Sequence, residues 1–226
     1  MLFTLPLSLG LLGLATAAPF ETRGGAPIPE YTTGVQLAFH VTDPQHPLCE
    51  RVHGMVFSTQ RLSQGVDMAV AVPREPGEGG NPAKAPVFYF ADSDGPASAT
   101  VLRSDVPGVY PRGTHVAARD SVGDTPGEYH VSLRTGLNGT AGLFSWQGAD
   151  NIPYLTGPAG SGYEQGGTYT VCPRTIGAWD LLLINYVYPG ETAAADCAPG
   201  KFVVLCAVLP ETEWSSGARS VPCVPQ

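Results

Sequence analysis

The sequence has few charged residues, and its basic residues are scattered. Charged residues make up 14 % of the 226 residues, with 12 Lys and Arg against 20 Asp and Glu, and the formal net charge is −8. Arg103, Arg112, Arg119 and Arg134 each stand alone, with no basic stripe and no interleaved aromatic residues. Proteins that bind nucleic acids or anionic membrane surfaces use clustered cations. We therefore expect no nucleic-acid partner.

Helical patterns and long apolar runs are also missing. No stretch shows apolar residues at i, i+3, i+4 and i+7 over three turns without Gly or Pro. The chain has 28 Gly and 22 Pro, roughly twice the usual share of these two residues, which predicts many turns and little helix. Beyond the first twenty residues, no run approaches the roughly eighteen apolar residues of a membrane span, so none is expected.

Signatures of metal and redox sites are absent. None of the five cysteines has the CxxC spacing of zinc or thioredoxin-like sites, and the five histidines do not cluster with other ligand types. We expect no metal and no cofactor. The five histidines are predicted to be solvated surface residues: His40, His46, His53, His115 and His130.

No catalytic motif is present either. Ser161, in Gly-Pro-Ala-Gly-Ser-Gly, lacks the GxSxG spacing of a nucleophile elbow. A pair of carboxylates for glycoside hydrolysis would have to come from the scattered acids Glu128, Glu164, Glu211 and Glu213. Because no motif unites these acids, we predict no catalytic residue.

The first residues of the chain have the pattern of an export signal. Residues 1–17 form an apolar run that ends in the small-residue pattern Ala15-Thr16-Ala17, which is typical of a secretory signal peptide. Residues 18–33 are rich in Pro, Gly and Ala without periodicity, so we expect a flexible amino-terminal arm. The protein is therefore predicted to be secreted, to the extracellular space or the cell wall.

Short strand patterns fill the rest of the chain. Val35, Leu37, Phe39 and Val41 alternate with polar or small residues, as in a half-buried strand. Similar or more uniformly apolar segments recur between turn residues: 51–59, 68–72, 87–90, 99–102, 114–118, 128–133, 143–147, 163–171, 181–188 and 202–209. The expected fold is all-β, an antiparallel β-sandwich or partly closed barrel of about ten strands with little helix.

One domain is expected over residues 34–226. Within it, residues 73–86 contain no apolar side chain larger than alanine and are predicted to form an exposed Pro/Gly loop.

Most of the cysteines should be paired in an oxidising compartment. Cys206 lies in the apolar segment 202–209, which makes it our first candidate for the unpaired cysteine. We also expect a bridge between Cys49 and Cys223 that ties the carboxy-terminal tail to the early sheet.

Two further positions are candidate surface sites. Asn138-Gly139-Thr140 is an N-glycosylation sequon with good turn chemistry, so a glycan is expected on Asn138. Aromatic residues crowd the carboxy-terminal half, including Trp146, Trp179 and Tyr154. Such residues can stack on sugars or fill a core. Tyr169 and Tyr186 are predicted in the core, and Trp214, in a polar setting, is the candidate ligand contact.

The carboxy-terminal third resembles a known family. Thr168-Tyr-Thr-Val-Cys172, the segment 181–188 and Cys197-Ala198 before the segment 202–209 are similar to the terminal block of uncharacterised secreted fungal proteins, defined as a domain of unknown function. The resemblance implies export, a β-rich fold and a disulfide between Cys172 and Cys197. It implies no active site.

Together these patterns predict a secreted, disulfide-bridged glycoprotein that acts by binding rather than catalysis. Carbohydrate or an extracellular protein is the expected partner. The alternatives are a secreted hydrolase with glycosidase-like carboxylates and an effector directed at a host.

Overall fold

The computed structural model describes residues 30–63, 65–74, 85–92, 100–105, 110–119, 127–140, 142–143, 145–158 and 167–226. The predicted signal peptide lies outside these ranges, as do residues 18–29 of the expected arm and residues 75–84 of the expected loop. At the two ends of that loop, Pro73 and Arg74 are exposed, whereas Pro86 is buried.

The fold is mostly antiparallel β-structure, as predicted. Every pairing between named strands is antiparallel. The described residues contain the strands β1 (Glu30–Thr32), β2 (Gly34–Val41), β3 (Val56–Ser63), β4 (Val66–Val72), β5 (Tyr89–Asp92), β6 (Thr100–Ser104), β7 (Arg112–Val116), β8 (Tyr129–Thr135), β9 (Ser145–Gln147), β10 (Pro153–Leu155), β11 (Thr168–Ile176), β12 (Trp179–Val187), β13 (Ala198–Ala207) and β14 (Val221–Cys223). Helical structure in them is limited to α1 (Cys49–Val52) and the 3-10 turn η2 (Ser215–Gly217).

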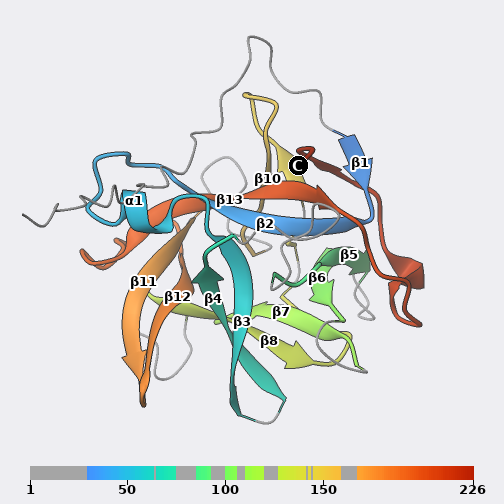
Figure 1. Cartoon of the computed structure of the whole chain (residues 1–226), viewed down its shortest axis with the longest axis horizontal. Helices are drawn as coiled ribbons and strands as arrows, with labels where there is room; N and C mark the ends of the chain where they lie inside the picture. Colours follow the sequence, from blue (N-terminus) through green and yellow to red (C-terminus); the bar gives the residue numbers. More distant parts are fainter. Residues whose placement is uncertain are drawn as a thin grey trace, which may run out of the picture.

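Six strands close into a ring. The pairings run from β12 through β4, β3, β2, β13 and β11 and return to β12. In Figure 1, β2 and β13 cross the upper part of the molecule side by side, and the β11–β12 hairpin descends on one side. The sheet is thus partly closed, because long strands that pair on both edges leave few open edges.

A second set of strands extends the same sheet. β5, β6, β7 and β8 follow one another, and β8 pairs with both β12 and β4. Val35 at the start of β2 exchanges two backbone hydrogen bonds of 2.8 Å with Phe88, just before β5. This bridge brings the extension back to β2, while β9 and β10 continue the sheet beyond β13.

The interior is packed with aromatic rings from alternate strand positions. Phe202 of β13 lies 5.2 Å from Phe39, 5.5 Å from Phe57 and 5.2 Å from Tyr169, measured between ring centroids. Tyr169 and Tyr186 are both buried. Because one face of β2 and β13 fills this core, the neighbouring residues on these strands point outward.

The local structure departs from the sequence prediction in three places. Residues 49–52 form α1, where the beginning of a strand over 51–59 was expected. Residues 30–32 form β1 and pair with β14, although they were assigned to the flexible arm. β10 and β14 were not predicted, because strands of three residues are too short to show an alternating pattern.

Two disulfides are present. Cys172 is bonded to Cys197, the pair that the family resemblance implies, and Cys206 is bonded to Cys223. The expected Cys49–Cys223 bridge is therefore wrong, and the free cysteine is Cys49 rather than Cys206. β14 runs beside the end of β13, where the Cys206 amide donates a hydrogen bond to the Val224 carbonyl over 2.8 Å. This contact brings Cys206, rather than Cys49, to Cys223.

Among the described residues, no helix is both long and apolar enough to cross a membrane.

Candidate functional site

A row of cross-strand partners crosses the outer surface of four neighbouring strands. Trp146 of β9 lies opposite Tyr154 of β10, which lies opposite Val203 of β13, which in turn lies opposite Ala38 of β2. Residues directly opposite each other project on the same face of a sheet. Trp146 is 50 % exposed, so this row presents a large aromatic surface to solvent.

A second, polar row lies two residues further along β13 and β2. Lys201 is opposite His40, and both side chains are exposed. Positions two apart on a strand share a face, so this pair borders the first row. We call this combined surface the aromatic face; it consists of Ala38, His40, Trp146, Tyr154, Lys201 and Val203.

The core holds this face in place. Phe39 and Phe202 are paired partners that alternate with the exposed residues, and both are buried. Gly200 precedes Lys201 where β13 passes closely over β2, and a Cβ atom there would lie 2.5 Å from the His40 carbonyl oxygen. The sequence therefore needs a residue without a side chain beside the Lys201–His40 pair.

The β9–β10 turn fixes the Tyr154 side chain. The Tyr154 hydroxyl donates to Asp150 Oδ2 over 2.6 Å, and the Ile152 amide donates to Asp150 Oδ1 over 3.1 Å. Burial opposes ionisation of Asp150, but these two hydrogen bonds, with smaller contributions that include the charge of Lys201, hold its pKa below the usual value. Burial, followed by the bond to Asp150, raises the pKa of Tyr154. Asp150 is therefore an ionised acceptor, and Tyr154 is a neutral donor.

Basic groups gather near Tyr154. Lys201 Nζ lies 4.8 Å from the centroid of the Tyr154 ring, as in a cation–π contact. The rings of His40 and His53 meet edge to face at 4.5 Å between centroids. Burial and then the charge of His53 lower the pKa of His40, with Lys201 acting in the same direction and Asp150 against it. His40 is therefore mainly neutral at pH 7.

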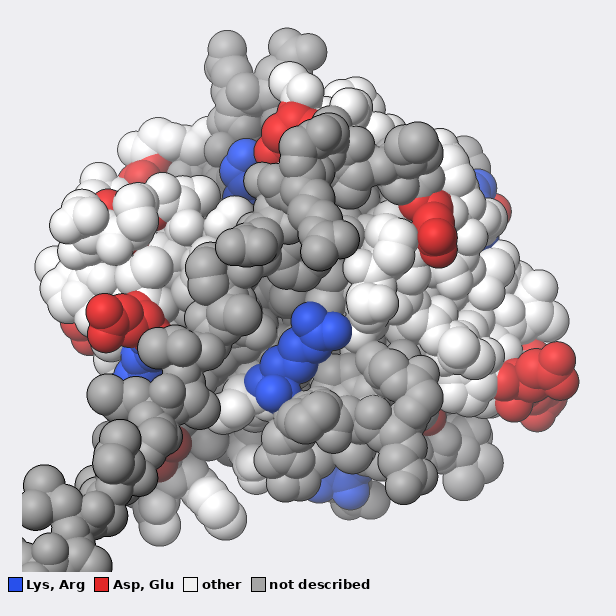
Figure 2. Space-filling view, turned by 45° about the horizontal axis from the view of Figure 1, so that its top comes forward, with Lys and Arg blue, Asp and Glu red and all other residues white. Residues whose placement is uncertain are grey.

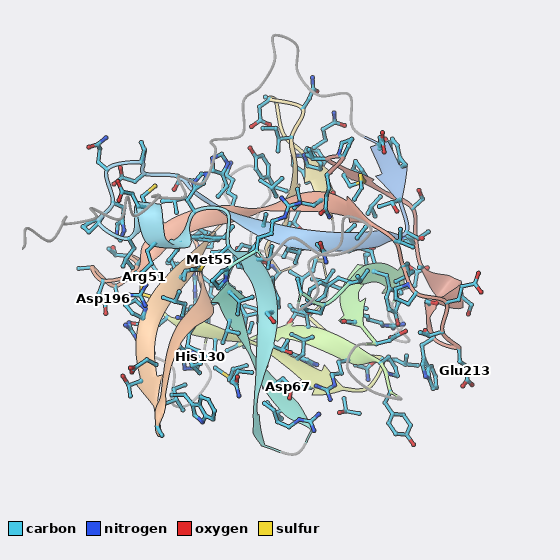
Figure 3. All side chains as sticks on the ribbon, in the orientation of Figure 1. Arg51, Met55, Asp67, His130, Asp196 and Glu213 are labelled. Atoms are coloured by element: carbon cyan, nitrogen blue, oxygen red, sulfur yellow. A yellow bond between two sulfur atoms is a disulfide. The ribbon has the colours of Figure 1, made fainter. Side chains whose placement is uncertain are left out.

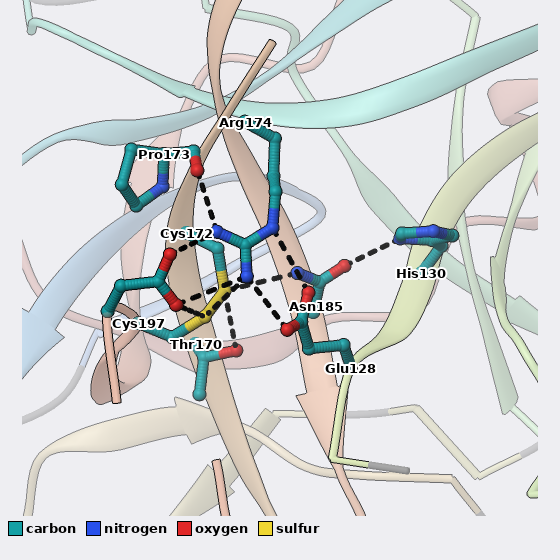
Figure 4. Close-up of a disulfide and its surroundings, with 9 residues drawn as sticks. Glu128, His130, Thr170, Cys172, Pro173, Arg174, Asn185 and Cys197 are labelled. Carbon is teal, nitrogen blue, oxygen red and sulfur yellow. Dashed lines mark hydrogen bonds and ion pairs between the residues drawn. A yellow bond between two sulfur atoms is a disulfide. The ribbon is translucent and has the colours of Figure 1, made fainter. Parts of the chain in front are cut away.

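A second polar cluster surrounds the Cys172–Cys197 disulfide (Figure 4). Arg174 pairs with Glu128 at 2.7 Å and with Asp196 at 2.6 Å, and its Nη2 lies 3.5 Å from Cys197 Sγ. The hydrogen bonds that Arg174 donates to Asp196 and, more weakly, to Glu128 raise the pKa of Arg174, while burial acts against them. The hydrogen bond from Arg174 lowers the pKa of Asp196.

The cluster continues inward through Asn185. This buried side chain donates from Nδ2 to Cys172 Sγ over 3.2 Å, and its Oδ1 lies 2.8 Å from His130 Nδ1. The two sulfurs and a Glu128 oxygen lie within 4.8 Å of one another, the spacing of metal ligands. The sulfurs are bonded to each other, so neither is a thiolate ligand or a nucleophile. The cluster therefore pairs polar groups, from the exposed Asp196 to the buried Asn185, around a cross-link.

The carboxylates considered for hydrolysis are placed differently. Glu128 and Asp196 both form ion pairs with Arg174, so these two acids lie near each other. Figure 3 shows Glu213 on the opposite side of the molecule from Asp196. Glu128 and Glu213 are therefore too far apart to act as one carboxylate pair. Glu164 lies outside the described residues, and Glu211 is exposed in the segment after β13.

The other predicted positions are not part of the aromatic face. Trp214 is half-buried and directly precedes η2. Asn138 is exposed, and the Thr140 hydroxyl next to it accepts a hydrogen bond of 2.8 Å from the Val116 amide. Ser161 lies outside the described residues. The sequence showed that aromatic residues are abundant, but only the strand register shows that Trp146 and Tyr154 share a face.

Lys and Arg do not cluster on the side of the molecule that includes the top of Figure 1. Figure 2 turns this side toward the viewer, and the described Lys and Arg side chains lie apart from one another there. No basic stripe is visible in this view.

Comparison with known proteins identifies a family. Residues 32–206 match a family described as a domain of unknown function (DUF7907). The match reaches far beyond the carboxy-terminal third, to which the resemblance in the sequence was limited. No curated protein and no solved structure matches the chain.

Proposed function

Because this chain belongs to the family defined by the domain of unknown function DUF7907, whose description names no activity, we propose a function from the geometry: a secreted binding module that holds carbohydrate on the aromatic face. The observation that carries the proposal is the exposed Trp146 ring directly opposite Tyr154 on a four-strand surface. Flat aromatic rings provide apolar contact area at low entropic cost and retain polar edges.

Polar groups border these rings. Asp150 of the β9–β10 turn supplies carboxylate acceptors, and Lys201 of β13 supplies an ammonium donor. A sugar ring has an apolar face and a rim of hydroxyls, so stacking with hydrogen bonds at the edge matches its chemistry. The turn hydrogen bonds to Asp150 fix this arrangement before a ligand arrives, which lowers the entropic cost of binding.

Secretion and glycosylation are part of the same proposal. The apolar leader ending at Ala17 supports export, and the two disulfides are compatible with an oxidising compartment. The exposed Asn138 supports glycan attachment.

A glycan array, followed by calorimetric titration of positive glycans, tests the binding role. Trp146→Ala should weaken binding by about 1 to 3 kcal/mol, the range for an aromatic contact at the centre of an interface. Trp179→Ala is the matched control, because Trp179 is 59 % exposed at the turn of the β11–β12 hairpin. Trp214→Ala tests the site suggested by the sequence.

Equal loss of affinity in the Trp146 and Trp179 variants would contradict the assignment to the aromatic face. Loss with Trp214→Ala alone, in a variant that melts like the wild type, would move the site to η2. Capture of an extracellular protein through Trp146, with no glycan bound, would replace carbohydrate by a protein partner.

A further inference from the structure

We propose that the aromatic face selects acidic sugars, with a sugar carboxylate bound between Lys201 and His40 while the ring of the same or the next sugar stacks on Trp146. This inference rests on the proposed function and specifies its substrate class. It starts from the position of the basic groups, which lie beside the aromatic rings.

The basic groups gather at this surface although the chain as a whole is acidic. Acidic residues outnumber Lys and Arg by 20 to 12, yet Lys201, His40 and His53 meet at one end of the aromatic face. An anionic ligand would find here an ammonium and two imidazoles beside the aromatic rings. A neutral sugar would gain only hydrogen bonds from this grouping, whereas a sugar carboxylate would also gain charge attraction.

Asp150, the acid that acts on His40, already accepts hydrogen bonds. Asp150 accepts hydrogen bonds from the Tyr154 hydroxyl and the Ile152 amide, so its oxygens serve the β9–β10 turn. Among the described residues, no ion pair joins Lys201 to Asp150. The Lys201 ammonium lies over the Tyr154 ring instead. A long, flexible lysine in that position can turn from the ring to an incoming carboxylate without breaking a salt bridge.

His40 makes the site sensitive to pH. His40 faces His53, Lys201 and Asp150, and the charges of His53 and Lys201 disfavour its protonation. A bound carboxylate would offset that repulsion, so proton uptake by His40 and binding of the anion favour each other. A sugar carboxylate with a pKa of about 3.5, like an α-carboxyl group, stays ionised while His40 gains its proton. Affinity for an acidic glycan should therefore rise from pH 7.5 to pH 5.5.

The experiment compares an oligogalacturonate with its fully methyl-esterified form, which keeps the sugar rings and removes the charge. Dissociation constants are measured by calorimetry at pH 7.5 and 5.5 for the wild type, Lys201→Gln, His40→Gln and Trp146→Ala. Arg134→Gln is the control, because it removes an exposed positive charge on β8. Thermal unfolding of each variant verifies its folding.

The wild type should bind the acidic oligomer about tenfold more tightly than the ester, and Lys201→Gln should remove most of that difference. His40→Gln should remove the gain in affinity at pH 5.5, and Arg134→Gln should change neither. Binding of acid and ester with equal affinity, both lost in Trp146→Ala, would overturn the acidic preference and leave the carbohydrate proposal standing. If neither oligomer binds while neutral glycans on the array do, the inference fails alone; if no glycan binds at all, the proposed function fails with it.

Discussion

Arg112 of β7 forms an ion pair with Asp67 of β4 across the intervening strand β8, and both side chains are almost fully buried. Arg61 contacts the other carboxylate oxygen of Asp67 at 3.4 Å from a position that is 60 % exposed. The pair ties the ring that contains β4 to the β5–β8 extension. Removing one member of such a pair leaves an uncompensated buried charge.

Asp67→Asn should therefore lower the free energy of unfolding by about 3 to 5 kcal/mol, measured by urea denaturation at pH 7. The matched control is Asp92→Asn, which breaks the pair of Asp92 with Arg219, whose side chains are 53 % and 47 % exposed. That substitution should cost at most about 1 kcal/mol. Equal losses in the two variants would contradict the role assigned to burial.

The disulfides lead to a second prediction. Cys172–Cys197 and Cys206–Cys223 close loops with sequence separations of 25 and 17 residues, and each should contribute about 3 kcal/mol in the chain-entropy treatment. Cys172→Ala and Cys223→Ala should each lower the melting temperature clearly, whereas Cys49→Ala should change it little. Non-reducing peptide mapping should join Cys206 to Cys223; a peptide containing Cys49 bonded to Cys223 would disprove this connectivity.

The sequence predicted the strands that carry a strong alternating pattern, and β2 is the clearest case. Val35, Leu37, Phe39 and Val41, the four residues that the alternation assigned to the core, are all buried, although Gln36 on the polar side is buried as well. The pattern failed at residues 49–52, because α1 is a single helical turn and four residues show no periodicity. A partly closed barrel was one of the two predicted architectures, but the strands that close the ring could not be predicted, since closure depends on β11 pairing with both β12 and β13.

The candidate site illustrates the same limit. Trp146 and Tyr154 were visible as aromatic residues, and His40 was correctly predicted to be on the surface. Their approach depends on the register of β9, β10, β13 and β2, which joins residues more than a hundred positions apart. Cross-strand register is set by packing and turn geometry, which a single sequence does not show.

Export and glycosylation provide a third prediction. Expression of the full chain in a eukaryotic host should give medium protein whose amino terminus is Ala18 or Pro19. Deglycosylation should reduce its mass, and Asn138→Gln should abolish that change, whereas Asn151→Gln, outside any sequon, should not. Retention of Met1 would contradict cleavage of a signal peptide. A mass unaffected by deglycosylation would contradict glycan attachment.

The pH dependence of stability provides the last prediction. Burial, followed by the charges of His53 and Lys201, lowers the pKa of His40, and burial with Arg134 lowers that of His115. The unfolded chain, with histidine pKa values near 6.5, therefore binds more protons than the folded chain just below that pH. The stability contributed by these neutral histidines is complete above about pH 6.5 and is lost as the pH falls through their folded pKa values.

The free energy of unfolding, measured by urea denaturation at intervals from pH 7.5 to pH 5, should accordingly fall with pH in the wild type. His40→Gln should make the decline shallower, because glutamine has no proton to gain, and the double variant with His115→Gln should make it shallower still. The two histidines lie on β2 and β7 and share no interaction among those identified, so their effects should add. A slope in His40→Gln identical to that of the wild type would show that the His40–His53 contact does not disfavour protonation, and the pH-dependent binding inferred for the aromatic face would lose its physical basis.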